Sequence, residues 1–122
     1  MTIEERYPEV AVIDDDAAVL DSFRFMLQAA GVRVVTYPSA TDFLASDGTP
    51  PRCLILDQNM PHMTGLELVA RLRDKGVAVP VLLVTSLVSP SLVAQAAQLG
   101  VAHVLAKPPS QDTILGFVAA CR

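Results

Sequence analysis

The sequence is organised around Cys53-Leu54-Ile55-Leu56-Asp57-Gln58-Asn59-Met60-Pro61, an apolar run that delivers one carboxylate and then stops. Consecutive apolar residues with a β-branched member and no polar alternation predict a strand that is buried on both faces. Asp57 then lies at the carboxyl end of this strand, where open parallel sheets place their ligand sites. Taken alone, Asp57 could equally be an aspartate that begins a turn. The choice between these interpretations depends on what the other strands bring to the same edge.

Short apolar segments alternate with helical patterns along the whole chain, which gives five strand-helix units. Strands are predicted at residues 9–14, 32–36, 53–57, 81–85 and 102–107. Helix starts are predicted at Ser39, Thr64, Ser89 and Ser110, and helix stops at Gly31, Gly76 and Gly100. The first helix is expected to face the core with Val19, Leu20, Phe23, Met26, Leu27 and Ala30, and Asp47-Gly48-Thr49-Pro50-Pro51 to close the second. This alternation implies a parallel sheet covered by helices on both faces, in one domain over residues 1–122.

Composition and charge argue against several classes of protein. The 52% hydrophobic and 18% charged fractions fit a folded α/β domain and exclude a disordered chain. A formal net charge of −4 without a basic cluster argues against direct nucleic-acid binding. The apolar runs are too short to span a bilayer, and no basic amphipathic helix is present to lie on a membrane. Cys53 and Cys121 are interpreted as two isolated, reduced thiols, which predicts a cytoplasmic protein.

Residues capable of chemistry follow four of the predicted strands: Asp14-Asp15, Asp57, Thr85 and Lys107. In a parallel sheet these positions converge on one edge. Crowded carboxylates repel one another, and a hard all-oxygen site of this kind favours Mg²⁺. Lys107 would then neutralise charge on Asp57 or on a phosphoryl group, and Thr85 would donate its hydroxyl to a phosphoryl oxygen. The plainer interpretations are a helix cap, a solvated lysine and a strand-ending threonine.

The combined pattern of Asp14-Asp15, Asp57-Gln58-Asn59-Met60-Pro61 through Gly65, Thr85 and Lys107-Pro108 resembles the receiver domain of two-component response regulators. The resemblance covers essentially the whole chain. It implies a doubly wound, flavodoxin-like α/β fold whose five parallel strands run in the order 2-1-3-4-5, with a crevice between the first and third strands.

The same resemblance implies a role for each site residue. Asp57 would accept a phosphoryl group from the phosphohistidine of a sensor histidine kinase or phosphotransfer protein. Asp15, Asp57 and the main-chain carbonyl of Asn59 would ligate Mg²⁺, with Asp14 acting largely through water, while Lys107 and Thr85 would contact the phosphoryl oxygens. Such a domain is a signalling switch and no enzyme beyond self-phosphorylation and autodephosphorylation. A homodimer and control of transcription are compatible with the resemblance.

The expected output residues are Thr85, Val104, Leu87 and His103, and two of them depart from the family pattern. Val104 stands where receivers commonly carry an aromatic ring that moves with the threonine. His103 is the nearest ring, but strand alternation places it on the opposite face of the sheet. Leu87 is apolar where many receivers are polar, and we expect it to impede the water that attacks the phosphorylated state. With Val88 and Leu92 it forms either a contact surface or ordinary core packing.

Two other functions compete with the switch. A pseudo-receiver would bind partners through the same fold without phosphorylation, and Val104 and Pro109, which replaces an aromatic residue after Lys-Pro, are compatible with it. A Mg²⁺-dependent phosphohydrolase would use Asp57 as its nucleophile. That chemistry usually needs a second aspartate two residues later, where this chain has Asn59. The acidic pair, Thr85 and Lys107 favour the switch.

Overall fold

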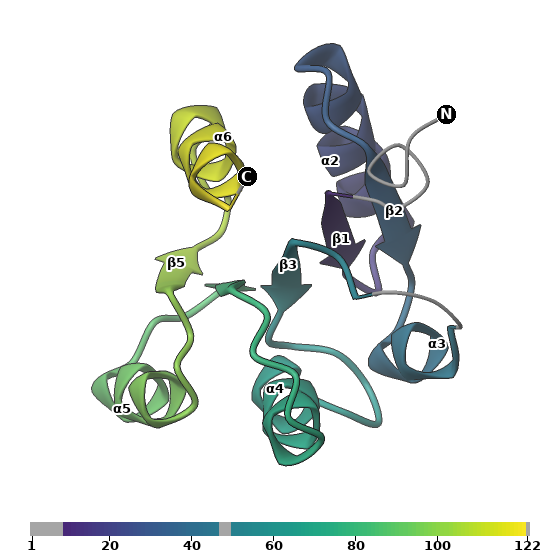
Figure 1. Ribbon diagram of the computed structural model, residues 1–122. Coiled ribbons are helices and arrows are strands. Elements are labelled where there is room, and N and C mark those ends of the chain that lie inside the picture. The colour runs from purple at the N-terminus through teal and green to yellow at the C-terminus, as the bar shows by residue number, and fades with distance from the viewer. Residues whose placement is uncertain (1–8, 47–49, 122) are drawn as a thin grey trace.

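The computed structural model describes residues 9–46 and 50–121, and its centre is a five-stranded sheet (Figure 1). The strands are β1 (Val10–Ile13), β2 (Val34–Tyr37), β3 (Cys53–Asp57), β4 (Val81–Thr85) and β5 (His103–Ala106). All neighbouring strands pair in parallel, in the order β2-β1-β3-β4-β5. The predicted doubly wound order is therefore confirmed, and β2 is an edge strand.

Helices cover both faces of this sheet. They are α2 (Ala17–Ala29), α3 (Ala40–Ala45), α4 (Gly65–Asp74), α5 (Pro90–Gln98) and α6 (Gln111–Ala120). Helices α2 and α6 lie on one face, and α3, α4 and α5 lie on the other (Figure 1). Parallel strands need such crossovers, because each chain segment must return to the starting edge before the next strand begins.

The three central strands β1, β3 and β4 are buried at every position. Because successive side chains point to opposite faces, each strand supplies two hydrophobic clusters. In β3, for example, Leu54 and Leu56 pack on the α3–α5 side, whereas Cys53 and Ile55 pack on the α2 and α6 side. Continuous apolar runs such as that of β3 are therefore required by the two-sided burial.

The predicted helix caps are confirmed. The side chains of Ser39, Thr64, Ser89 and Ser110 each accept a hydrogen bond from a backbone N–H in the first turn of the helix that follows. Such caps satisfy donors that have no partner within the helix. The three predicted stops, Gly31, Gly76 and Gly100, have φ values of +79°, +78° and +71°, which glycine adopts without steric cost.

Some predicted boundaries are wrong by one or two residues. The second strand begins at Val34 rather than at residue 32, because the Val32 amide donates to Leu27 O and still belongs to the end of α2. Ala30 is exposed, since it is the C-cap of that helix rather than part of its inner face. Of the turn expected at residues 47–51, residues 47–49 lie outside the described residues.

Strands β1 and β5 are each one residue shorter at both ends than predicted. The residues just beyond their carboxyl ends are nevertheless held to the sheet. Asp14 N donates to Tyr37 O at 3.2 Å, and Lys107 N donates to Thr85 O at 2.8 Å. These two backbone hydrogen bonds fix the positions from which both side chains reach toward β3.

Candidate functional site

Strand register brings the predicted site residues to one edge of the sheet. Ile13 pairs with Leu56, so the next residues, Asp14 and Asp57, emerge side by side from β1 and β3. Asp57 in turn pairs with Val84, which places Thr85 one position further along on β4. The site therefore lies at the carboxyl ends of β1, β3, β4 and β5, next to the point where the chain changes direction across the sheet.

Three carboxylates gather at this edge. Asp14 and Asp57 are each 3% exposed, whereas Asp15 is exposed to solvent. One carboxylate oxygen from each of the three lies within 4.8 Å of the others. The Asp14 carboxylate also accepts a hydrogen bond from Asp16 N at 2.9 Å, and Asp16 itself caps α2. Of the three consecutive aspartates, therefore, two face the site and the third begins the helix.

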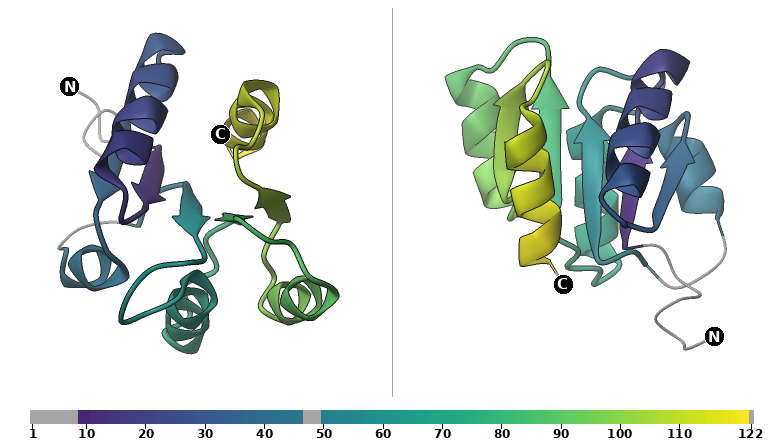
Figure 2. Two further views of the ribbon diagram at one scale, coloured as in Figure 1. Left: turned by 180° about the vertical axis from the view of Figure 1, so that it is seen from behind. Right: turned by 90° about the horizontal axis from the view of Figure 1, so that it is seen from above.

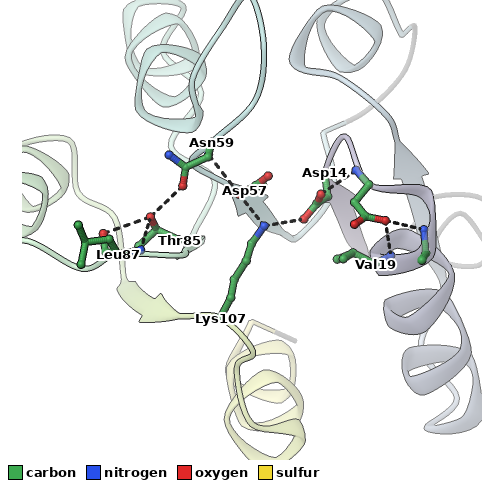
Figure 3. A network of polar contacts seen from close by, with 9 residues as sticks. Asp14, Val19, Asp57, Asn59, Thr85, Leu87 and Lys107 are labelled. Atoms are coloured by element: carbon green, nitrogen blue, oxygen red, sulfur yellow. Dashed lines mark hydrogen bonds and ion pairs between the residues drawn. The ribbon is translucent and has the colours of Figure 1, made fainter.

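Lys107 pairs with both buried carboxylates. Its Nζ lies 3.0 Å from Asp57 Oδ1 and 3.4 Å from Asp14 Oδ2, as the dashed lines in Figure 3 show. The Lys107-Pro108 peptide bond is cis. Figure 3 shows the lysine reaching from the end of β5 to a position between the two aspartates.

The electrostatics of the site favour a proton or cation near Asp14. Burial raises the pKa of Asp14, and the neighbouring charge of Asp57 raises it further, although hydrogen bonds from Asp16 and Lys107 act in the opposite direction. Burial alone would lower the pKa of Lys107, but its interactions with Asp57 and Asp14 outweigh this effect and raise it. The lysine is thus held in its charged form, and one positive charge faces three carboxylates.

A second set of hydrogen bonds joins Thr85 to Asn59. The Thr85 hydroxyl, which is buried, donates to Asn59 Oδ1 at 3.0 Å, and Leu87 N donates to Thr85 Oγ1 at 3.3 Å (Figure 3). The main-chain N–H of Asn59 donates to Asp57 Oδ1 at 3.1 Å. Asn59 therefore contacts both the predicted phosphoacceptor and the predicted switch residue.

Sequence reasoning missed the Asn59 side chain, because it assigned only the main-chain carbonyl of this residue. The contact joins positions 59 and 85, which are distant in sequence and come together only when β3 pairs with β4. An amide two residues after Asp57 is the available sequence signal, but it does not specify the partner.

Gly65 brings the start of α4 against the carboxyl end of β3. A Cβ atom at this position would lie 2.7 Å from Asp57 O and 2.8 Å from Leu83 Cδ1. Two further contacts hold the same loop: Gly65 N donates to Gln58 O at 3.1 Å, and Leu66 N donates to the Gln58 side chain at 2.9 Å. The loop that carries Asn59 is therefore closed by a glycine that has no room for a side chain.

The remaining predicted residues lie away from the carboxylates. Val104 is partly buried and packs against the cluster beneath α3, α4 and α5. His103 is exposed and lies edge-on to Phe117 of α6, with ring centroids 5.8 Å apart, so the predicted alternation is confirmed. Leu87 is 75% exposed, whereas Leu92 packs against the core, which divides the apolar group that the sequence suggested.

The fold and this edge define a class: a doubly wound α/β domain with an acidic site paired to a lysine. A family model described as the response regulator receiver domain matches residues 10–119. The chain belongs to this family, which is one of signalling proteins rather than of classical enzymes. An acidic group like that of Asp14, Asp15 and Asp57 is typical of the Mg²⁺-binding site of receiver domains.

The names of similar curated proteins are consistent with membership of this family. The chain is 37% identical over 112 residues to the transcriptional regulatory protein FixJ of Azorhizobium caulinodans, covering 91% of this chain and 53% of that protein. It is 31% identical over 110 residues to the response regulator protein TmoT of Ectopseudomonas mendocina, covering 89% and 50%. The chain thus spans about half the length of the curated relatives that it matches.

Solved structures of similar proteins have the same fold as this chain. The chemotaxis protein CheY4 of Vibrio cholerae superposes with a TM-score of 0.85 at 28% identity, covering 95% of this chain and 99% of that one. A structure described as FixJ-N has a TM-score of 0.81 at 29% identity, covering 92% and 90%. Within residues 9–46 and 50–121, no helix is long and apolar enough to cross a membrane.

Proposed function

We propose that Asp57 accepts a phosphoryl group from the phosphohistidine of a histidine kinase or phosphotransfer protein, in a Mg²⁺-dependent reaction. The observation that carries this proposal is the position of Lys107 Nζ, 3.0 Å from Asp57 Oδ1 and 3.4 Å from Asp14 Oδ2. It combines a buried carboxylate, a cation and a further acidic pair at one strand edge. Membership of the receiver family supports the same kinase partner.

The chemistry follows from these groups. A carboxylate oxygen of Asp57 would form a bond to phosphorus while the phosphorus–nitrogen bond of the donor breaks and imidazole leaves. Lys107 would exchange part of its interaction with Asp57 for a phosphoryl oxygen, so that its charge neutralises the transferred group. The buried setting strengthens this attraction relative to bulk water.

The donor set fits a hard divalent cation. Carboxylate oxygens of Asp14, Asp15 and Asp57 and the main-chain carbonyl of Asn59 would hold it, and oxygen ligands of this kind suit Mg²⁺. Since one lysine faces three carboxylates whose oxygens lie within 4.8 Å of one another, the site retains negative charge for a cation to balance. The ion would supply charge neutralisation for the incoming phosphoryl oxygens.

Thr85 would report the phosphorylated state. Its hydroxyl is bound to Asn59 Oδ1, and the acceptor oxygens of a phosphoryl group would compete for it. Val104 pairs with Leu83 on β4 and lies on the α4 side, so a change at Thr85 would reach β5 through strand packing rather than through a moving ring. His103, on the other face, would act on α6.

Asn59 offers a direct test of this switch. In an Asn59→Ala variant the Thr85 hydroxyl loses its shorter acceptor, Asn59 Oδ1, and keeps Leu87 O at 3.3 Å. We therefore expect its hydroxyl resonance and those of the following loop to shift toward the phosphorylated pattern before any donor is added. An Asn59→Asp variant keeps an acceptor oxygen and serves as the control. Identical NMR spectra for Asn59→Ala and the wild type around Thr85 would contradict this role.

Further proposals concern the cellular location, the output and a possible second copy of the chain. We propose a cytoplasmic protein whose output controls transcription, since the relative from Azorhizobium caulinodans is named as a transcriptional regulator. Leu87 and Val88 are exposed apolar residues at the start of α5, and a second copy of the chain could dock there. No direct contact between this domain and nucleic acid is proposed.

The test is intact-mass measurement after incubation with Mg²⁺ and a small phosphodonor. We expect one phosphoryl adduct in the wild type, and none in the Asp57→Asn variant or when a chelator is present. Absence of the adduct with every donor and with candidate kinases would favour the pseudo-receiver. Sustained turnover of a phosphate ester would instead favour the hydrolase.

A further inference from the structure

Helix α5 is held to the sheet by fewer buried side chains than any other helix of nine or more residues. Within this helix only Ala96 is buried, whereas α4 buries five residues. Leu92 and Leu99 pack partly against the core, and Val93 is 44% exposed. A segment with few buried apolar contacts has low local stability. The position of α5 therefore depends on the polar contacts at its two ends.

The carboxyl end of α5 is bound by Arg73, a residue in the last turn of α4. Arg73 Nε donates to Leu99 O, the carbonyl of the C-cap of α5, at 2.8 Å. Its Nη1 donates to Val77 O and to Val79 O, both at 2.9 Å, in the segment between α4 and β4. Figure 1 and the left view of Figure 2 show α4 and α5 side by side on the same face of the sheet. The guanidinium group of Arg73 thus connects α5 to the segment that leads into β4.

Carbonyl groups at a helix end suit a positively charged donor. The last carbonyls of a helix have no partner within it, and the helix dipole makes this end negative. A guanidinium group presents several N–H donors in a rigid plane, so one side chain can bind carbonyls of two segments at once. Arg73 is partly buried, and water therefore competes less for these hydrogen bonds than at an exposed position.

The amino end of α5 is held differently. Its connection to β4 runs from Thr85 through the exposed Leu87. Leu87 N donates to Thr85 Oγ1 at 3.3 Å, and the Thr85 hydroxyl lies 3.3 Å from Leu87 O. Ser89, the N-cap, accepts a hydrogen bond from Leu92 N of the same helix. Within the part of the chain that the structure describes, the hydrogen bonds of residues 86–89 therefore run to Thr85 or to α5 itself.

We propose that Arg73 anchors the carboxyl end of α5, so that this helix tilts about Leu99 and its amino end, beside Thr85, is the mobile end. The helix has nine residues and is about 14 Å long. A tilt of about 10° would therefore move its amino end by about 2 Å. The inference concerns the unmodified fold and is independent of phosphorylation at Asp57.

The anchored end also protects the connection from α5 to β5. Val101 N donates to Ala96 O at 3.0 Å, and Ala102 N donates to Val81 O at 2.9 Å, so the chain beyond α5 is bound to the start of β4. A group that drew the Thr85 hydroxyl away from Leu87 would release the opposite end. The displacement would then fall on the exposed apolar turn and would leave β5 in place. Arg73 is thus a positioning residue for the turn beside Thr85.

The test is native-state amide hydrogen exchange, followed by NMR on the unphosphorylated protein. In the wild type, the amides of Gly100 and Val101, which are bonded within the end of α5, should exchange more slowly than that of Val93, which is bonded to Ser89 O. Arg73→Met keeps an apolar stem but removes the donors. We expect exchange at residues 100 and 101 to accelerate by about 10–100-fold. This acceleration should exceed that of the β3 amides, which report unfolding of the whole domain.

Arg71→Met is the matched control. Arg71 lies in the same last turn of α4 and is exposed, so this variant removes the same charge from the same helix end. We expect exchange at residues 100 and 101 to match the wild type. Arg73→Lys keeps the charge without the planar group and should give an intermediate acceleration. It also keeps the test valid if Arg73→Met does not fold.

Three results would overturn the inference. Equal acceleration at residues 100 and 101 and in β3 would show that Arg73 stabilises the whole domain rather than the end of α5. Equal effects of Arg71→Met and Arg73→Met would assign the effect to charge alone. Slower exchange of Val93 than of Gly100 in the wild type would show that the carboxyl end is the mobile one. None of these results bears on Asp57, which the mass measurement tests separately.

Discussion

Replacing Gly65 by alanine tests how tightly the site loop is built. The new Cβ would lie 2.7 Å from Asp57 O and 2.8 Å from Leu83 Cδ1, both shorter than any ordinary contact. Forcing a methyl group into a filled core costs about 1–3 kcal/mol, because neighbouring atoms must move. Alanine in place of glycine in a helix returns up to about 1 kcal/mol. With the full return subtracted, we therefore expect Gly65→Ala to lower the free energy of unfolding by up to about 2 kcal/mol.

Gly116 provides a matched control, since a Cβ there would meet nothing within 4 Å. It lies inside α6, where alanine is the better helix former, so Gly116→Ala should raise the free energy of unfolding by about 0.5–1 kcal/mol. The same chemical change is thus predicted to have opposite signs at two positions. The close approach between α4 and β3 gives Gly65 the unfavourable sign, and Gly116, in the interior of α6, has no such contact.

Urea unfolding followed by circular dichroism measures both variants. A change of 1 kcal/mol corresponds to about 4 °C in a domain of this size, so thermal unfolding gives an independent check. Because Asp57 O is the atom that must move, Gly65→Ala should also slow phosphorylation, whereas Gly116→Ala should not. Equal stabilisation of both variants would refute the argument that Gly65 is required by the contact with Asp57 O.

Three further substitutions test the electrostatics and kinetics of the site. The pKa of Asp14 is raised in the folded protein, so protonated Asp14 stabilises the fold at low pH. This stability is lost as pH rises from 3.8 through the folded-state pKa, because the buried carboxyl group then becomes charged. Asp14→Asn removes that charge and should therefore stabilise the protein at neutral pH in the presence of a chelator. Thermal unfolding at both ends of this range should show the two proteins converging in acid, and equal stability at neutral pH would contradict the prediction. Lys107→Met keeps the apolar stem but removes the charge 3.0 Å from Asp57 Oδ1, so phosphotransfer monitored by rapid quench should slow by about 10²–10³-fold, and an unchanged rate would remove Lys107 from the chemistry. Leu87→Glu alters a 75% exposed side chain, so folding should be unaffected while loss of the phosphoryl group accelerates; identical lifetimes would show that Leu87 does not impede water.

Local chemistry explains why much of the fold was predictable. Ser89 followed by Pro90 caps a helix through contacts within four residues, and the run from Cys53 to Asp57 must be a two-sided strand because all its positions are apolar or terminal. The convergence of Asp14, Asp57 and Lys107 follows from parallel pairing alone. These features depend on near neighbours or on the general rules of a parallel sheet.

Contacts between distant side chains were beyond such reasoning. The hydrogen bond from Thr85 to Asn59 depends on rotamers at two strand ends, and the edge-on contact of His103 with Phe117 depends on where α6 lies over the sheet. Neither has a periodic or sequential signature. The start of β2 was misjudged for a related reason, since Val32 completes α2 through a backbone bond that its side chain does not indicate.

The central claim is that Asp57 itself carries the phosphoryl group. An aspartyl phosphate is an acyl phosphate, which borohydride reduces to homoserine, so reduction followed by peptide sequencing identifies the modified residue. After phosphorylation by a kinase or small donor with Mg²⁺, the reduced residue should occur at position 57 and at neither Asp14 nor Asp15. Homoserine at another position, or a phosphorylated protein with unmodified Asp57, would contradict the account.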